Sequence, residues 1–271
     1  MTTTTEPYAH LAPAYDRLVD WVVTERGECP RGRIADFLAE YWGGRPRPVR
    51  TVLEVCCGTG LTLAELAGRG YAVTGLDRSA AMLEQAARRL GPDVPLVQAQ
   101  LPSIPLRPGF DAVISAAAGL NYLPDETALT ETLAAVARVL APGGTFVFDL
   151  LSTTLLERSF DPAAPRVQGA ELEDVSYLWT FETPPSRAHF DLTYVQFLRR
   201  PDAPGQTYVK TREVHRMYPV PQEAVRRAAD RAGFTDVAVH DNYGPHRAGP
   251  ETLYETWTLA LPAAPAAGEH G

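Results

Sequence analysis

Short apolar runs alternate with amphipathic helical segments through the middle of the chain, and this alternation constrains the fold more than any other feature. The expected strands cover residues 51–55, 71–77, 94–99, 110–116 and 145–151. The expected helices between them cover residues 61–70, 79–90 and 125–140, with Ser79 as an N-cap and Asp125 near a helix start. Strands that alternate with helices of this length predict a parallel sheet covered on both faces.

The rhythm changes in the second half of the chain. Three strand-like runs follow one another without a helix between them, over residues 175–182, 188–199 and 207–218. They predict an antiparallel insertion that covers residues 170–218 and acts as a lid. A helix over 221–234 and two closing strands over 234–241 and 251–261 are then expected, the strands as an antiparallel pair at one edge of the sheet.

The flanks of this pattern set the expected domain boundaries. Helices are predicted over residues 8–23 and 32–42, and Gly143 and Gly144 after Pro142 predict a turn before the last parallel strand. The core is expected to cover residues 7–169 and to resume over 219–261. The polar residues 1–6 and the tail 262–271 are expected to be disordered.

Charge and cysteine content exclude several functional classes. The chain has 25 basic and 33 acidic residues, a net charge of −8, which argues against nucleic acid as the main partner. Its three cysteines, Cys29, Cys56 and Cys57, form no CxxC pair, so neither a metal site nor a disulfide framework is predicted. No signal peptide and no apolar stretch of about 20 residues is present, so a soluble, cytoplasmic protein without membrane contact is expected.

The turn after the first strand carries the most informative motif. Gly58 and Gly60 remove side chains where the next helix begins, so an anionic or polar ligand can lie against backbone N–H groups. Asp77 ends the second strand, where an acid accepts hydrogen bonds from a ribose diol. Together these residues predict a nucleoside cofactor.

A nicotinamide dinucleotide fits this turn poorly. Leu63 stands where the third glycine of GxGxxG belongs, and Glu54, just before the turn, would repel a pyrophosphate. Glu54 would instead attract a ligand that carries an ammonium group. A nicotinamide-dependent reductase stays the alternative, although the only lysine, Lys210, has Gln206 and not Tyr four positions before it.

The segment VLEVCCGTG resembles the first motif of class I S-adenosylmethionine-dependent methyltransferases. Other motifs of that family follow in order around it: Tyr15-Asp16, GLDRSAAML, FDAVIS and LAPGGTFVFDL. The resemblance covers about residues 8–160, and the remainder is similar to small-molecule members with a β insertion, such as N,N-dimethyltransferases of amino sugars. It implies a Rossmann-like sheet of seven mostly parallel strands and S-adenosylmethionine as cofactor.

The resemblance also implies roles for individual residues. Glu54 and the backbone from Cys56 to Gly60 would hold the methionine end, with Tyr15 and Arg33 at its carboxylate, and Asp77 would take the ribose hydroxyls. The full set of expected cofactor-binding residues is Tyr15, Arg33, Glu54, Cys56, Gly58, Gly60, Asp77, Arg78, Met82, Gln100, Leu101 and Ala116. Two departures stand out: Cys56 replaces the usual first glycine, and Gln100 replaces an acid at the adenine amino group, where an amide oxygen can still accept a hydrogen bond.

The acceptor is expected between the N-terminal helix, the loop after the fourth strand and one face of the insertion. Alternation along residues 207–218 places Glu213 and His215 on one face, which makes His215 the candidate base and Glu213 its partner or an anchor of the lid. The expected acceptor-binding residues are Tyr8, Asn121, Tyr122, Trp179, Glu213 and His215, and the expected catalytic residues are His215 and Tyr15.

The predicted function is methyl transfer to a small molecule, an aromatic or amine-bearing secondary metabolite, at nitrogen, oxygen or carbon. The partner is therefore a small-molecule acceptor, and a homodimer is left open. A non-catalytic cofactor-binding subunit is the remaining alternative, because no acceptor pocket has a unique sequence signature.

Overall fold

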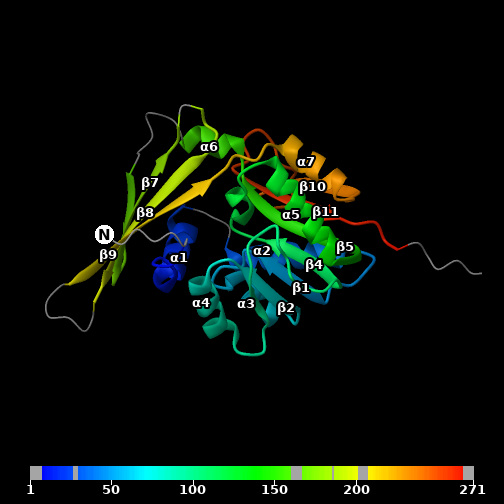
Figure 1. Cartoon of the computed structure of the whole chain (residues 1–271), viewed down its shortest axis with the longest axis horizontal. Coiled ribbons are helices and arrows are strands. Elements are labelled where there is room, and N and C mark those ends of the chain that lie inside the picture. Colours follow the sequence, from blue (N-terminus) through cyan, green and yellow to red (C-terminus); the bar gives the residue numbers. More distant parts are fainter. Residues whose placement is uncertain (1–7, 27–29, 160–166, 185, 201–206, 265–271) are drawn as a thin grey trace, which may run out of the picture.

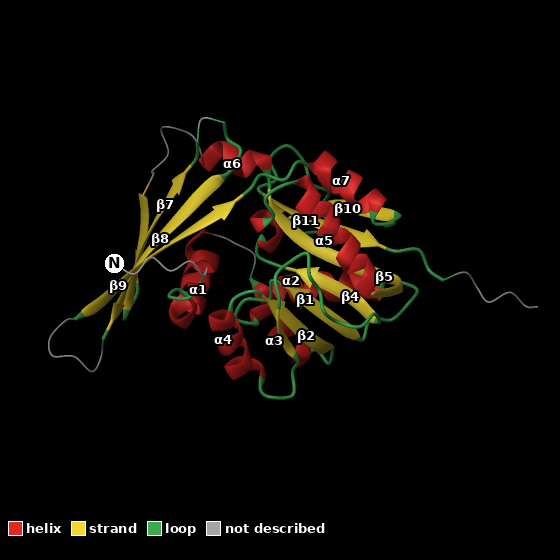
Figure 2. Ribbon diagram, viewed as in Figure 1, coloured by secondary structure: helices red, strands yellow, loops and turns green. Residues whose placement is uncertain are grey.

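The structure is a computed structural model that describes residues 8–26, 30–159, 167–184, 186–200 and 207–264. The expected disordered ends fall largely outside these residues, as does Cys29. Within the described part the chain forms two sheets with helices packed around the larger one (Figure 1, Figure 2). The second sheet stands to one side of the first.

The larger sheet has seven strands in the order β10-β11-β5-β4-β1-β2-β3. The strands are β1 (Thr51–Val55), β2 (Ala72–Asp77), β3 (Leu96–Gln98), β4 (Phe110–Ser115), β5 (Leu140–Leu151), β10 (Asp236–Asp241) and β11 (Tyr254–Ala260). Only β11 runs against its neighbours, β5 and β10. The predicted α/β fold with a seven-stranded, mostly parallel sheet is confirmed, and so is the antiparallel pair at its edge.

Both faces of this sheet are buried, which explains why its strands read as continuous apolar runs. The helices are α2 (Arg31–Gly43), α3 (Leu61–Gly68), α4 (Ala80–Leu90), α5 (Glu126–Val139) and α7 (Gln222–Arg231). Along β1, Val52 packs with residues of α2 and α3, whereas Leu53 packs with residues of α5 and α7. Ser79 and Asp125 cap α4 and α5 by accepting the backbone N–H of Met82 and Ala128, as their sequence positions predict.

The second sheet is antiparallel, in the order β6-β7-β8-β9, which confirms the predicted insertion. Its strands are β6 (Val167–Glu171), β7 (Val175–Glu182), β8 (Phe190–Arg199) and β9 (Tyr208–Met217). The sequence predicted three of them and missed β6, because this edge strand is short, mostly exposed and interrupted by Gly169. The antiparallel segment therefore begins at Val167, before the expected residue 170.

The N-terminal segment lies against the second sheet. A 3-10 turn, η1 (Ala12–Ala14), precedes α1 (Tyr15–Arg26), and Figure 1 shows α1 between the second sheet and α4. The buried Tyr177 hydroxyl of β7 donates to the Ala14 carbonyl at 2.6 Å. The helix expected from Tyr8 thus starts at Tyr15: Tyr8 has φ +68°, and Pro13 favours the first turn of a helix over its interior.

Two further elements differ from the sequence expectations. Helix α6 (Thr153–Ser159) was not predicted, because seven residues are too few to show a clear helical period. The expected turn at Gly143 and Gly144 lies inside β5, whose pairing with β4 shifts register next to Gly143 at φ +77°. Gly144 is required there by close packing, since a Cβ would approach the Ala141 carbonyl oxygen to 2.7 Å.

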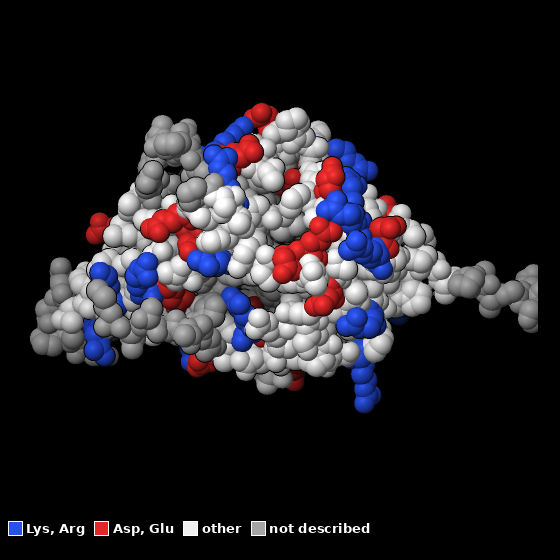
Figure 3. Space-filling model, turned by 45° about the horizontal axis from the view of Figure 1, so that its top comes forward, with Lys and Arg blue, Asp and Glu red and all other residues white. Residues whose placement is uncertain are grey.

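Surface charge is mixed. On the face shown in Figure 3, acidic and basic side chains are interspersed over both parts of the molecule. Among the described residues, no helix combines the length and the apolar character that crossing a bilayer requires. The described residues also contain no cluster of three or more His, Cys, Asp or Glu side chains that could hold a metal ion.

Candidate functional site

The loop after β1 winds through left-handed backbone at three positions. Cys56, Gly58 and Gly60 have φ values of +57°, +54° and +75°. Such angles favour glycine, which explains why Cys56 is the unusual residue of this motif. The Cys56 side chain is accommodated because residue 119 is Gly: a Cβ there would lie 2.8 Å from the Cys56 Cβ. Burial raises the pKa of the Cys56 thiol to about 12, so this thiol stays protonated and unreactive at neutral pH.

Gly60 has a packing role. It is the N-cap of α3, and a Cβ at this position would lie 2.9 Å from the Leu90 Cδ1 and 3.3 Å from the Ala86 Cβ of α4. Gly60 lines none of the three cavities described below. Gly58 does line two of them, and a Cβ there would meet nothing within 4 Å.

Asp77 ends β2 and fixes the loop. Its two carboxylate oxygens accept the backbone N–H groups of Gly58 and Ser79, each at 2.9 Å. Burial raises the pKa of Asp77, while these hydrogen bonds from Ser79 and Gly58 act to lower it. Each oxygen has a second lone pair, so Asp77 can still accept a hydrogen bond from a ligand.

A cavity of about 290 Å³ opens beyond the carboxyl ends of β1, β2 and β4. This is where open α/β sheets bind ligands. Eight of the predicted cofactor-binding residues besides Tyr15 line it: Cys56, Gly58, Asp77, Arg78, Met82, Gln100, Leu101 and Ala116. Arg78 also places its guanidinium 5.2 Å from the centre of the Tyr122 ring.

Glu54 faces a smaller cavity of about 40 Å³, together with Tyr15, Arg31 and Thr59. The Glu54 side chain is buried, and its Oε2 has no hydrogen-bond partner among the described residues. Burial raises the pKa of Glu54 to about 8, although Arg31 acts to lower it. A buried carboxyl group with one unpartnered oxygen is suited to an ammonium group, which would restore its charge.

Arg33, expected at the methionine carboxylate, lines none of these cavities. Two residues along a helix point in different directions, so Arg33 projects from α2 toward Gly244 whereas Arg31 projects into the small cavity. Arg33 was predicted from its position in the sequence alone, and Arg31 was not predicted, because the sequence does not show how α2 is rotated against the glycine loop.

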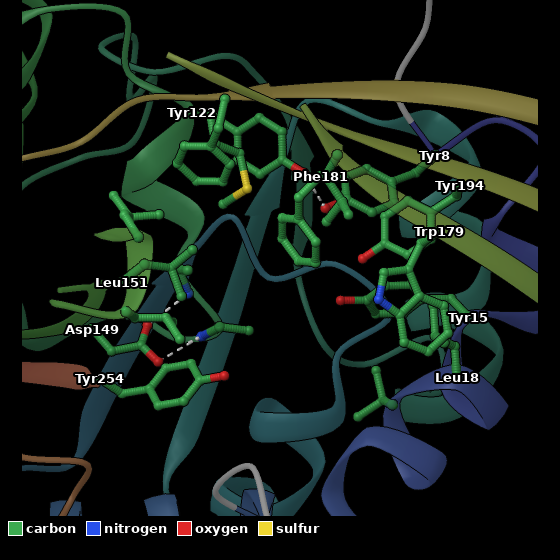
Figure 4. Close-up of a pocket in the computed structure, with 18 of the residues that line it drawn as sticks. Tyr8, Tyr15, Leu18, Tyr122, Asp149, Leu151, Trp179, Phe181, Tyr194 and Tyr254 are labelled. Atoms are coloured by element: carbon green, nitrogen blue, oxygen red, sulfur yellow. Dashed lines mark hydrogen bonds between the residues drawn. The ribbon is translucent and has the colours of Figure 1, made fainter. Parts of the chain in front are cut away.

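A third cavity, of about 180 Å³, lies between α1, the end of β5 and the second sheet (Figure 4). Its walls are mostly apolar and aromatic: Leu18, Val19, Ile34, Leu151, Leu155, Leu156, Trp179, Phe181, Phe190, Leu192 and Met217. Asp149 lies at its floor and accepts the backbone N–H groups of Ala117 and Ala118 at 3.2 and 2.8 Å. Asp149 was not among the residues predicted from the sequence, although its position at the carboxyl end of a parallel strand is a usable signal.

The two larger cavities share a wall. Tyr8, Tyr15, Ala117 and Tyr122 line both of them. Tyr15, the first residue of α1, also lines the small cavity beside Glu54. The predicted residues Tyr8, Tyr15 and Tyr122 thus lie where the two spaces meet, and Trp179 lines the third cavity beside Tyr15 (Figure 4).

The remaining residues predicted to bind the acceptor lie behind this wall. His215 and Glu213 are buried and line none of the three cavities, because the N-terminal segment covers that face of β9. Asn121 is fully buried and connects its loop to two other segments. Its side chain accepts the Leu151 N–H at the end of β5 and donates to the Tyr218 carbonyl just after β9, both at 3.0 Å. The expected direct contact of these three residues with an acceptor is therefore not what the geometry provides.

One ion pair ties α1 to the glycine loop. The Thr59 hydroxyl donates to Asp16 Oδ1 at 2.6 Å, and Arg89 of α4 bonds both Asp16 and the Thr59 carbonyl. Asp16 was noted in the sequence only as part of a motif. The contacts of Asp16 keep its neighbour Tyr15 beside the glycine loop. They explain why the Tyr15-Asp16 pair accompanies the glycine motif.

Comparisons with known proteins agree with this arrangement. A family model described as a methyltransferase domain matches residues 52–144. The protein YqeM of Bacillus subtilis (strain 168), which bears a methyltransferase name, is 35% identical over 131 residues, 47% of this chain and 52% of YqeM, so the chain spans about half of that relative. The 2-phytyl-1,4-naphtoquinone methyltransferase of Thermosynechococcus vestitus is 30% identical over 206 residues, 69% of this chain and 87% of that protein.

The chain belongs to the class I S-adenosylmethionine-dependent methyltransferases. Its fold is also similar to that of the sugar N-methyltransferase KedS8 from Streptoalloteichus sp. ATCC 53650, with a TM-score of 0.74, 22% identity and coverage of 97% of this chain and 98% of that one. S-Adenosylmethionine is the cofactor of the family, and it supplies a methyl group already activated by the sulfonium charge. The residues of this methyltransferase fit it, since the orphaned Glu54 oxygen belongs to the small cavity, Asp77 lines the larger one, and Gly58, where a Cβ would meet nothing within 4 Å, lines both.

Proposed function

We propose that this enzyme methylates an aromatic small molecule bound between α1 and the second sheet. The observation that supports this most is the shared wall: Tyr8, Tyr15 and Tyr122 border both the family's cofactor cavity and the aromatic-lined cavity beside it. Methyl transfer is an in-line displacement. The donor sulfur, the methyl carbon and the attacking acceptor atom must therefore lie on one line where the two cavities adjoin. The aromatic and aliphatic lining favours a flat, largely apolar acceptor.

On the donor side, Glu54 binds the ammonium group, Asp77 the ribose hydroxyls, and Arg78, Met82 and Leu101 flank the adenine. Arg31 takes the methionine carboxylate in place of Arg33, because it shares the small cavity with Glu54 and Tyr15. Tyr15 positions the sulfonium end beside the acceptor. The second sheet acts as a lid whose Trp179, Phe181 and Tyr194 exclude water from the acceptor.

An amine-bearing acceptor is the second candidate. Asp149 supports it, because a carboxylate in the wall of a mostly apolar cavity attracts an ammonium group. The relatives carry names of both kinds, a naphthoquinone methyltransferase and a sugar N-methyltransferase.

Calorimetry and methyl transfer test the proposal together. The purified protein should bind S-adenosylhomocysteine and not NAD. Incubation with methyl-labelled S-adenosylmethionine and a metabolite extract should label an organic-soluble aromatic product. Binding of NAD without S-adenosylhomocysteine would point to the reductase alternative, and tight cofactor binding without any labelled product would point to the non-catalytic subunit.

A further inference from the structure

Four polar side chains form a continuous hydrogen-bonded chain behind the shared wall. The Tyr8 and Tyr122 hydroxyls lie 2.6 Å apart, the Tyr122 hydroxyl lies 2.8 Å from His215 Nδ1, and His215 Nε2 lies 3.2 Å from Glu213 Oε2. Three separate segments supply these residues: the N-terminus, η2 (Gly119–Tyr122) and β9. Only the tyrosine end reaches the cavities.

Glu213 anchors the buried end as a carboxylate. Its Oε1 accepts the backbone N–H groups of His10 and Leu11 at 2.6 and 3.1 Å, and its Oε2 accepts that of Tyr8 at 2.7 Å. Burial acts to raise the pKa of Glu213, but the hydrogen bonds from His215 and from these backbone groups outweigh burial, so its pKa lies below the ordinary value. Glu213 is therefore ionised at neutral pH and accepts only.

An ionised Glu213 sets the tautomer of a neutral His215, and with that tautomer the direction of the chain. His215 Nε2 must carry the proton that Glu213 Oε2 accepts, which leaves Nδ1 without a proton in the neutral ring. Nδ1 then accepts from the Tyr122 hydroxyl, and the Tyr122 oxygen in turn accepts from Tyr8. Every donor points inward, so the lone pairs of the Tyr8 oxygen are left to face the two cavities.

Burial also keeps the hydroxyls protonated. It raises the pKa of Tyr8 and of Tyr122 above the ordinary tyrosine value. Neither residue is therefore a free phenolate base. A hydroxyl that accepts one proton as it gives up another needs no such charge, and two buried, neutral tyrosines in series can move a proton in this way.

We propose that Tyr8, Tyr122, His215 and Glu213 are a proton relay, and that the methyl acceptor of this enzyme is a hydroxyl-bearing compound, a phenol or an enol, that gives its proton to Tyr8. Tyr8 is the catalytic residue, and Tyr122, His215 and Glu213 act through it. This inference rests on the proposed function.

The step balances without a further reactant. The acceptor oxygen attacks the methyl carbon of S-adenosylmethionine, a C–O bond forms, and the C–S bond breaks with its electron pair staying on sulfur. The acceptor proton passes to Tyr8, the Tyr8 proton to Tyr122, and the Tyr122 proton to His215 Nδ1, where Glu213 stabilises the imidazolium. After the product leaves, the proton returns through Tyr122 and Tyr8 to water that enters the cavity. An acceptor whose nucleophile is a carbon conjugated to the hydroxyl uses the same relay, with a C–C bond in place of the C–O bond.

A hydroxyl acceptor needs this relay, whereas a neutral amine does not. Methylation of a neutral hydroxyl without proton loss would produce an oxonium ion, which is far higher in energy than the ammonium ion that an amine produces. An amine product can release its proton after it leaves the enzyme. The buried relay is thus informative about the acceptor, because it has a function only where the proton must leave during transfer.

His215→Asn separates a proton relay from simple packing. The Asn Oδ1 can accept the Tyr122 hydrogen bond but cannot take up a proton. The probes are 1-naphthol and 1-naphthylamine, which share one ring system, with methyl-labelled S-adenosylmethionine. We expect His215→Asn and Tyr8→Phe to lower kcat on 1-naphthol by about 10²- to 10⁴-fold with KM changed only a few-fold. The rate on 1-naphthylamine should change far less. Tyr177→Phe, which removes a buried hydroxyl outside the relay, is the matched control and should stay near the parent rate.

A second readout needs no acceptor. Nitrogen-15 NMR of histidine-labelled protein, with the His215 signals assigned through their loss in His215→Asn, should find Nδ1 unprotonated and Nε2 protonated. Tyr122→Phe should shift the Nδ1 signal. A proton on Nδ1 would reverse the chain and overturn the relay.

The transfer assay has equally definite outcomes. Full activity of His215→Asn on 1-naphthol, equal losses on both probes, or transfer to 1-naphthylamine alone would each overturn the relay. Absence of transfer to 1-naphthol would overturn the acceptor class. These failures differ from failure of the proposed function, in which S-adenosylhomocysteine itself does not bind.

Discussion

The two halves of the proposed active site are built in different ways. The donor half consists of loops that each follow a strand of the large sheet, and the contact between Gly58 and Asp77 joins residues 19 positions apart. The acceptor half joins residues from opposite ends of the chain, such as Tyr8 and Glu213, which are 205 positions apart. Of the four packing clusters, two lie beside the large sheet and one lies between α1 and the second sheet, while the fourth, which contains Ala118, Phe190 and Met217, joins the two parts.

Because of this difference, donor binding and acceptor chemistry should respond to different substitutions. Donor binding depends on loop geometry that the sheet imposes locally, so it should survive changes in the second sheet. Acceptor chemistry depends on docking of the N-terminal segment onto β9, so it should fail when either is disturbed. The following predictions test that separation, from the largest expected effect to the smallest.

Removal of the second sheet should separate the halves most strongly. Replacing residues 167–217 with a short linker should lower methyl transfer by more than about 10²-fold, because the acceptor loses the walls that orient it. Affinity for S-adenosylhomocysteine should fall by less than about tenfold. Labelled-methyl transfer and calorimetry measure the two quantities on one preparation, whose cooperative unfolding shows that the core is folded. Equal loss of both would mean that the sheet supports the core.

Asp77→Ala should act on the donor half alone. Loss of a hydrogen bond to a charged group costs about 1.5–3 kcal/mol, so affinity for S-adenosylhomocysteine should fall about tenfold to a hundredfold. Calorimetry measures it, with Asp236→Ala as control, because that carboxylate pairs with Arg45 at the sheet edge, outside all three cavities. Unchanged affinity in Asp77→Ala would reject the ribose assignment.

Glu54 should make cofactor binding release a proton. Burial raises its pKa to about 8, so it is mostly protonated at pH 7, and an ammonium group beside it favours the carboxylate. Binding of S-adenosylhomocysteine at pH 7 should therefore release up to about one proton, measurable by calorimetry in buffers with different ionisation enthalpies. Glu54→Gln should abolish the release, and an unchanged release in this variant would assign the proton to another group.

The same pKa shift sets a stability trend for the free protein. Folding raises the pKa of Glu54 from 4.5 to about 8, so the folded chain holds a proton that the unfolded chain releases in this window. Its contribution to the free energy of unfolding is thus greatest at low pH and falls as pH rises from about 4.5 to 8. Denaturant unfolding should show a shallower fall with pH in Glu54→Gln than in the parent.

Tyr177→Phe should have the smallest effect. It removes the donor to the Ala14 carbonyl, a contact between the second sheet and the start of α1. Loss of this hydrogen bond should lower the free energy of unfolding by about 0.5–1.5 kcal/mol. Cofactor affinity should not change, and a matching loss of affinity would show that the halves are coupled through α1.

The sequence determined the large sheet and most of the donor half. Apolar runs with the right spacing fix strands buried on both faces, and Asp77, Gly58 and Cys56 follow those strands directly, so their location needs no long-range information. The exceptions are informative. Gly60 is needed for close packing against α4 and lines none of the three cavities. Whether Arg31 or Arg33 reaches the small cavity depends on the rotation of α2, which a motif does not encode.

Only the tertiary structure decided the acceptor half. Alternation along β9 correctly placed Glu213 and His215 on the buried face, but not what covers that face. The N-terminal backbone covers it, because Glu213 offers a carboxylate to three N–H groups that a turn at φ +68° leaves unpaired, and His215 is thereby enclosed behind Tyr8 and Tyr122. A strand's periodicity specifies which side of a sheet a residue faces, whereas the partner on that side is set by packing between segments that the sequence separates by 205 positions.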